Sequence, residues 1–197
     1  MRSLVVLLLA TLPCAALAQE NPVLAPVEST AHRHLGFFFR ADIGIGYVDN
    51  SGNGGLASQP LVRSVSIPIG LAVGGAVAED WILAGEVWGL AGPQDVQPPG
   101  KGFLIYGYSL AVVHYFMPAN VYVSIAPGVS RLMFVTADVG VSSDWGPGAK
   151  LAIGKEWWVG DHWGLGIAAE LLLSFNTQAG DPRTTVAPGL TFSATFN

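Results

Sequence analysis

Hydrophobic residues alternate with small or polar residues along most of the chain, with a period of two. The clearest example is the last stretch, where Val186, Leu190 and Phe192 share one parity while Thr185 and Thr191 share the other. This alternation predicts β-strands with one apolar face, because a helix would repeat every three or four residues. The same pattern predicts eight strands, at about 35–47, 65–77, 81–91, 103–116, 121–134, 145–158, 163–175 and 185–196.

The predicted strands are long for a soluble protein. Each covers about 11–14 residues, whereas a tilted strand needs about 9–11 residues to cross a bilayer and strands in soluble folds have about 5–6. Hydrophobic residues make up 51% of the chain and charged residues only 12%, against about 25% charged residues in a typical soluble domain. These values favour a protein whose solvent is lipid.

Beyond residue 18 the sequence has no apolar run long enough to form a membrane-spanning helix. A closed barrel is the other structure that satisfies all its backbone hydrogen bonds within lipid. We therefore predict an all-β fold, an eight-stranded antiparallel up-and-down transmembrane β-barrel.

The connections between the predicted strands alternate in length. Outer-membrane barrels have short periplasmic turns and longer extracellular loops, so the alternation predicts an outer-membrane location with both chain termini in the periplasm. The short connections are 78–80, 118–120 and 160–161, and the longer ones are 49–60, 92–101, 136–143 and 176–183.

The first residues have the pattern of a secretory signal. Arg2 precedes the apolar run at 4–12, and the small residues "ALA" at 16–18 form a cleavage site. We expect cleavage after Ala18, which removes Cys14, the only cysteine. The chain is then predicted to have three parts: a signal peptide at 1–18, a flexible periplasmic arm at 19–34 and the barrel at 35–197.

Aromatic residues gather near the short connections. Outer-membrane barrels carry aromatic girdles at both membrane interfaces, and we predict such a girdle at the turns. Trp158 has the opposite parity to Trp157, so it either plugs the mouth of the lumen or marks a bulge. The predicted girdle comprises Trp81, Tyr115, Phe116, Trp157 and Trp163.

From these features together, residues 35–197 resemble the small eight-stranded outer-membrane barrels of the OmpA-anchor, OmpX and OmpW type. The resemblance implies two sets of partners: outer-membrane lipid with lipopolysaccharide, and the barrel-assembly machinery. Members commonly end in an aromatic residue that this machinery reads. The last strand here is "TFSATFN", so the implied assembly signal is Phe192 with the penultimate Phe196, and Asn197 departs from the pattern.

A few charged residues share the parity that faces the lumen. A lone buried charge costs several kcal/mol, roughly, so these groups should pair with one another or meet water. We expect Arg40 to approach Glu170 across the barrel interior. The residues can form an ionic plug that closes the lumen, or a gated polar path that opens when Arg40 or Lys150 changes partner. They are Arg40, Asp42, Glu86, Lys150, Glu156 and Glu170.

Other kinds of chemistry find little support. The formal net charge of −5 argues against nucleic acid as a partner. Catalysis on lipids or peptides would need a histidine near the outer face, whereas His32 and His34 lie in the predicted arm and His114 and His162 lie near turns. They form no set of metal ligands. We predict no enzymatic activity, no metal and no cofactor.

Three functions remain open. The first is a non-enzymatic outer-membrane barrel with a structural or envelope-interaction role. The second is a narrow channel or carrier for small or apolar solutes. For this function, four strand prolines matter because proline weakens strand pairing: Pro68, Pro127, Pro147 and Pro188. The third is a secreted lipocalin-like binder, which would place the large apolar residues inside.

Overall fold

The computed structural model describes residues 33–52, 62–93, 102–135 and 140–197. The strands are β1 (Phe37–Gly52), β2 (Val62–Ala78), β3 (Trp81–Pro93), β4 (Gly102–Phe116), β5 (Val121–Val135), β6 (Gly140–Ser142), β7 (Gly146–Trp158), β8 (Trp163–Gln178) and β9 (Asp181–Phe196). Within the described ranges, no helix is long and apolar enough to cross a membrane.

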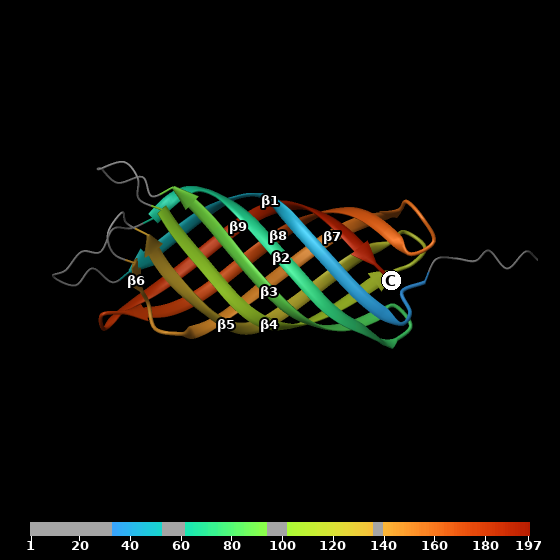
Figure 1. Ribbon diagram of the computed structural model, residues 1–197, viewed down its shortest axis with the longest axis horizontal. Coiled ribbons are helices and arrows are strands. Elements are labelled where there is room, and N and C mark those ends of the chain that lie inside the picture. Colours follow the sequence, from blue (N-terminus) through green and yellow to red (C-terminus); the bar gives the residue numbers. More distant parts are fainter. Residues whose placement is uncertain (1–32, 53–61, 94–101, 136–139) are drawn as a thin grey trace, which may run out of the picture. The chain divides into compact units, whose positions relative to one another are not determined.

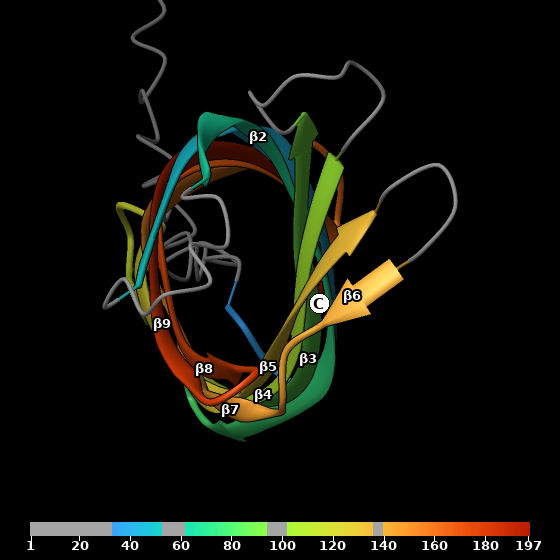
Figure 2. The same ribbon diagram turned by 90° about the vertical axis from the view of Figure 1, so that its left-hand side faces the viewer.

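The strands pair antiparallel and the sheet closes on itself. The order around the sheet is β4, β3, β2, β1, β9, β8, β7 and β5, and β5 pairs back to β4. The short β6 pairs with β5 on the same side as β7, so these two segments form one barrel strand. Figure 1 shows the tilted strands side by side, and Figure 2 shows the closed ring. The predicted eight-stranded antiparallel barrel is confirmed.

One end of the barrel, which we call the terminal end, holds the start of β1 and the end of β9. The turns at 79–80, 117–120 and 159–162 lie at this same end. Asp80 and Asn120 adopt positive φ angles of 61° and 52° in two of these turns, a conformation that Asp and Asn tolerate better than most residues. The predicted loops 49–60, 92–101 and 136–143 begin too early or end too late, because β1 runs to Gly52, β3 to Pro93 and β6 covers Gly140–Ser142 at the opposite end of the barrel. The rest of these three loops lies almost wholly outside the described residues.

The fourth predicted long loop, at 176–183, is wrong. β8 continues to Gln178, β9 begins at Asp181, and these two residues face each other in the ladder. Only Ala179 and Gly180 form the turn, with φ angles of 51° and 86°. Two successive positive φ angles are typical of a tight type I′ hairpin turn. The polar residues of 176–178 and 181–183 therefore lie in paired strands and not in a loop.

The two parities of each strand face opposite sides of the barrel wall. On β1 and β9, Ile43 is 58% and Phe192 is 70% exposed on the outside, whereas Asp42 is 8% and Thr191 is 2% exposed on the inside. Most of the large apolar side chains thus form the outer surface, and the charged and polar side chains face the lumen together with a smaller set of buried apolar ones. This arrangement is the reverse of the one expected for a lipocalin-like binder.

Three of the four strand prolines coincide with interruptions of the ladder, whereas Pro147 pairs with Val129 in the unbroken β5–β7 ladder. Within the described strands, the β1–β2 register skips the positions around Pro68, and the β1–β9 register skips those around Pro188. The β4–β5 register skips the positions around Pro127. Proline has no N–H to donate, so one ladder bond cannot form there.

The glycine that follows Pro127 explains one of the repeated "APG" triplets. A Cβ atom on Gly128 would lie 2.0 Å from the carbonyl oxygen of Tyr108. The neighbouring strand therefore approaches more closely than any side chain would permit. Proline with glycine marks a sharp bend in the wall, as glycine kinks do in barrels generally.

Candidate functional site

The lumen is filled by two apolar groups of side chains that lie at different heights. The group nearer the terminal end includes Phe38, Ile82 and Tyr122, and the group in the opposite half includes Trp88 and Phe103. The predicted charged residues lie beside and between these groups. All six point into the barrel interior, as their parity predicts, and in each ion pair described below the side chains are at most 9% exposed.

The first charged cluster, near the terminal end, joins Arg40 and Glu156. The Arg40 Nη2 atom donates to Glu156 Oε1 at 3.0 Å and to the Tyr115 hydroxyl at 2.6 Å. The hydroxyl groups of Tyr115 and Thr195 donate to the same carboxylate, at 3.2 Å and 2.7 Å. The Arg40 guanidinium also lies 4.1 Å from the centre of the Tyr122 ring, within the range of a cation–π contact.

The second cluster lies deeper and surrounds Lys150. Its ladder neighbours are Ala126 of the first apolar group and Leu172 of the second, so the Lys150 backbone lies between one residue of each group. The Lys150 Nζ atom pairs with Glu86 and lies 3.5 Å from Glu170 Oε1 and 3.7 Å from Asp42 Oδ2. One cation is therefore shared by three carboxylates.

The expected approach of Arg40 to Glu170 is wrong. Arg40 faces Thr195 of β9, and Thr195 faces Gly164 of β8. Glu170 therefore lies six residues (164 to 170) further along β8 from the terminal end. Because strands in a barrel are staggered, residues on neighbouring strands need not lie at the same height. The structure instead pairs Arg40 with Glu156, and Glu170 with Lys150.

Tyr115 was predicted in the aromatic girdle but lies inside the lumen. Its side chain is 1% exposed, and its hydroxyl group bridges Arg40 and Glu156. Adjacent residues on a strand face opposite sides, so Tyr115 and Phe116 could not both point outward. The shared parity of Tyr115 with the inward residues Ala111 and Val113 would have identified it.

The other four predicted girdle residues point outward at the terminal end. Their exposed fractions lie between 43% and 49%. Trp81 stacks on His114 at 4.2 Å between ring centroids, and Trp163 meets Phe196 edge-on at 5.3 Å. These residues are Trp81, Phe116, Trp157 and Trp163. Phe192, the other residue of the implied assembly signal, lies on the outer surface.

His34 was assigned to a flexible arm at 19–34, but it is a fixed part of the barrel mouth. Residues 19–32 lie outside the described residues. The His34 side chain is fully buried and stacks on Tyr115 with ring centroids 3.4 Å apart. The Trp158 ring lies 5.1 Å from it, so Trp158 faces the mouth, the first of its two predicted roles. Nothing in the alternation pattern marks His34, because it precedes the first strand.

The described histidines lie at one end of the barrel. His34, His114 and His162 all lie at the terminal end. In the described part of the chain, no group of three or more His, Cys, Asp or Glu residues could hold a metal ion.

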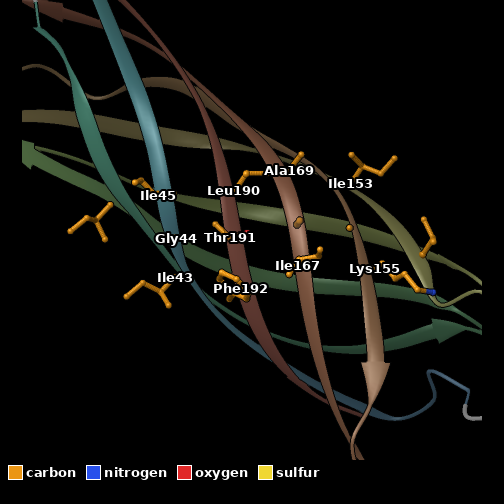
Figure 3. Close-up of a pocket in the computed structure, with 14 residues that line it drawn as sticks. Ile43, Gly44, Ile45, Ile153, Lys155, Ile167, Ala169, Leu190, Thr191 and Phe192 are labelled. Atoms are coloured by element: carbon orange, nitrogen blue, oxygen red, sulfur yellow. The ribbon is translucent and has the colours of Figure 1, made fainter.

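The outer wall carries a shallow groove of about 830 Å³. Figure 3 shows Ile43, Leu190, Ile167 and Ile153 around it, from four neighbouring strands. Apart from Lys155 and Thr191, its lining is apolar, so few groups could orient a polar ligand. A much smaller void of about 10 Å³ lies inside the barrel beside Lys150 and Glu170. That volume is about the minimum for one water molecule.

Comparison with solved structures finds the same fold in small outer-membrane barrels. Neisserial surface protein A is 14% identical, covers 79% of this chain and 96% of its own, and gives a TM-score of 0.53. OprG of Pseudomonas aeruginosa is 11% identical (85% and 99% covered, TM-score 0.47), and Ail of Yersinia pestis is 12% identical (81% and 99%, TM-score 0.43). The sequence matches no protein-family model and no curated protein. The feature shared with Neisserial surface protein A is the fold, a closed antiparallel β-barrel.

Proposed function

We propose that the protein is a non-enzymatic integral outer-membrane barrel with a structural or envelope-interaction role, whose lumen is closed by paired charges. The observation that carries this proposal is the pairing of all six predicted lumen charges in two clusters, with the Lys150 backbone between one residue of each apolar group. Conduction would need a continuous wet path past both apolar groups. The void of about 10 Å³ beside Lys150 is too small for such a path.

The proposed orientation places the terminal end in the periplasm. It rests on the tight turns at that end and on the outward aromatic side chains of Trp81, Phe116, Trp157 and Trp163, which suit a headgroup region. The apolar outer surface would contact lipid and lipopolysaccharide. The signal peptide at 1–18 would be cleaved on export, and the barrel-assembly machinery would read Phe192 and Phe196 on β9.

Single-channel conductance of the refolded protein in a planar lipid bilayer tests the closed lumen. We expect no conductance from the wild type, provided that a heat-modifiable gel band shows that the barrel is folded. Arg40→Ala removes the partner of Glu156 inside the lumen. Arg63→Ala is the matched control, because Arg63 pairs with Asp49 on the exposed surface at 3.0 Å. Steady conductance of the folded wild type would reject the closed lumen.

A second candidate function, a carrier for small or apolar solutes, is favoured by the wall around β1. Pro68 and Pro188 flank this strand, so its ladder is interrupted on both sides between Gly44 and Val48. A second outer groove, of about 350 Å³, lies here and is lined by Val65 and Leu190. It shares Gly46, Pro188 and Gly189 with the lining of the void inside the barrel. At this point a wall of two glycines and a proline, with an interrupted ladder, separates the lumen from the outer surface.

The flux of an apolar dye into proteoliposomes tests this second function. An Ile45→Cys/Leu190→Cys pair, at facing positions of the β1–β9 ladder, leaves Pro188 in place and would clamp β1 to β9 on oxidation. The mature chain has no other cysteine if the signal is removed. A carrier would lose its flux when the clamp is oxidised and regain it on reduction. A wild-type protein that carries no dye would exclude this function.

A further inference from the structure

The start of the barrel is fastened to the last residue of the chain through His34. Its Nε2 atom lies 2.8 Å from the Asn120 Oδ1 atom, and its Nδ1 atom lies 2.7 Å from the Asn197 Nδ2 atom. Since an amide nitrogen can only donate, Nδ1 must accept and Nε2 must donate. This pair of bonds requires the neutral imidazole.

Asn197 is itself held in place from a second side. Its backbone N–H donates to the His162 carbonyl at 3.0 Å, and its own carbonyl lies 3.0 Å from the His162 Nδ1 atom. The residue therefore joins the turn between β7 and β8 to His34. Asn197, which follows Phe196 where an aromatic residue was expected, is thus the residue whose side chain holds His34.

Protonation would remove one of the two bonds and place a charge in a closed site. An imidazolium has two donors and no acceptor, so the Asn197 amide nitrogen would face another donor. Rotation of the amide would restore that bond but not the solvation lost by a fully buried cation. The His34 side chain has no exposed surface and stacks flat on Tyr115.

Charged and titratable groups surround the imidazole on every packed element. The Asp80 carboxylate accepts from the His34 backbone N–H at 3.4 Å, and Glu156 and Arg40 lie beyond Tyr115, with Tyr122 beside them. His162 lies on the far side of Asn197, whose carbonyl oxygen is 3.0 Å from the His162 Nδ1 atom.

Burial lowers the pKa of His34 below its ordinary value, and this effect exceeds the opposing influence of the Asn120 and Asn197 side chains and of the Glu156 and Asp80 charges. The neutral form is therefore favoured when the site is closed. The resulting stability is present above the ordinary histidine pKa of about 6.5 and is lost as the pH falls below it.

We propose that His34 is a pH-sensitive clasp that fastens the start of β1 to Asn197 and closes the terminal mouth of the barrel, and that it opens when the imidazole is protonated. Opening exposes the Arg40–Glu156 cluster to water. Only the placement of this mouth in the periplasm rests on the proposed function; the clasp does not depend on a closed lumen.

Amide hydrogen exchange of the full refolded chain tests the clasp. Protection of residues 34–38, corrected for the intrinsic rate, should fall between about pH 7.5 and about pH 5, by up to roughly thirtyfold when the closed imidazole stays neutral. His34→Gln keeps a polar side chain that does not titrate, so its protection should not change with pH. The matched control His114→Gln removes an imidazole at the same end that stacks on Trp81 and not on the clasp, and it should behave as the wild type.

Two further measurements distinguish a failure of the clasp from a failure of the closed lumen. Asn197→Asp supplies an acceptor for the imidazolium and should reverse the pH dependence, so that protection rises as the pH falls. The imidazole resonances of wild-type His34, followed by NMR, should titrate below the ordinary value. A wild-type protein whose corrected exchange does not change with pH, or whose His34 titrates at or above about 6.5, overturns the clasp. Wild-type conductance in a planar bilayer would instead reject only the closed lumen.

Discussion

The Arg40–Glu156 pair should contribute far more to stability than an ion pair on the outside of the same barrel. Glu156→Gln keeps the size of the side chain but removes the charge that faces Arg40. Both side chains are nearly inaccessible, 8% and 1% exposed, so the remaining guanidinium would be an uncompensated buried charge. Breaking such a pair costs about 3–5 kcal/mol.

A double-mutant cycle isolates the interaction from the other effects of each substitution. Arg40→Met should cost a similar free energy, because Glu156 then keeps only the hydroxyl donors of Tyr115 and Thr195. Arg40→Met/Glu156→Gln leaves no charge behind, so the double variant should be more stable than the sum of the two losses predicts. We expect a coupling free energy of at least about 2 kcal/mol, within the range for residues in direct contact.

Equilibrium unfolding in urea, followed by tryptophan fluorescence of the protein in lipid vesicles, measures this coupling. The Arg63–Asp49 pair provides the matched cycle, since its side chains are 65% and 39% exposed. Such exposed pairs contribute about 0–1 kcal/mol. If the coupling of the lumen pair is no larger than that of the surface pair, the lumen cluster is hydrated and the closed lumen is wrong.

Three further substitutions test other parts of the barrel. Lys150→Met should destabilise the fold by about 3–5 kcal/mol, because it leaves three buried carboxylates without the cation that they share. The urea midpoint, compared with that of Arg63→Ala on the exposed surface, checks this. Gly128→Ala should abolish the heat-modifiable folded band, because its Cβ would lie 2.0 Å from the Tyr108 carbonyl oxygen. The control Gly85→Ala should keep the band, since the atom nearest to its Cβ would be 3.9 Å away. Equal behaviour of the two variants would contradict the close approach of the strands at Gly128. Tyr115→Phe should lower the free energy of unfolding by about 1–3 kcal/mol, because two buried charged groups lose a hydrogen bond; an unchanged urea midpoint would show that water replaces the hydroxyl group.

The side of the wall that each residue faces could be predicted from the sequence, because parity depends only on neighbouring residues. Arg40 and Lys150 were therefore correctly placed inside. The partner of each charge could not be predicted in this way, because it depends on the stagger between strands that are far apart in the sequence. For that reason Arg40 was assigned to Glu170 and not to Glu156.

Two other errors have different physical causes. The stretch 176–183 has the composition of a loop, yet Gln178 and Asp181 pair in the ladder, because strands can continue past the apolar belt with polar residues on both faces. His34 belongs to no periodic segment, and its burial depends on Asn120 and Asn197, which the chain brings to it only when the barrel closes.

The Lys150 cluster has a consequence for the electric field inside the barrel. With all groups ionised, one positive charge against the three carboxylates of Asp42, Glu86 and Glu170 leaves a net charge of −2 (1 − 3). The Arg40–Glu156 pair adds nothing to this sum, and Arg183, also buried on the inward parity of β9, adds one positive charge, so the barrel interior keeps a net charge of −1 (−2 + 1). Any leak through the lumen would therefore attract cations and repel anions, and a measured preference for potassium over chloride would identify current that passes through the barrel rather than around it.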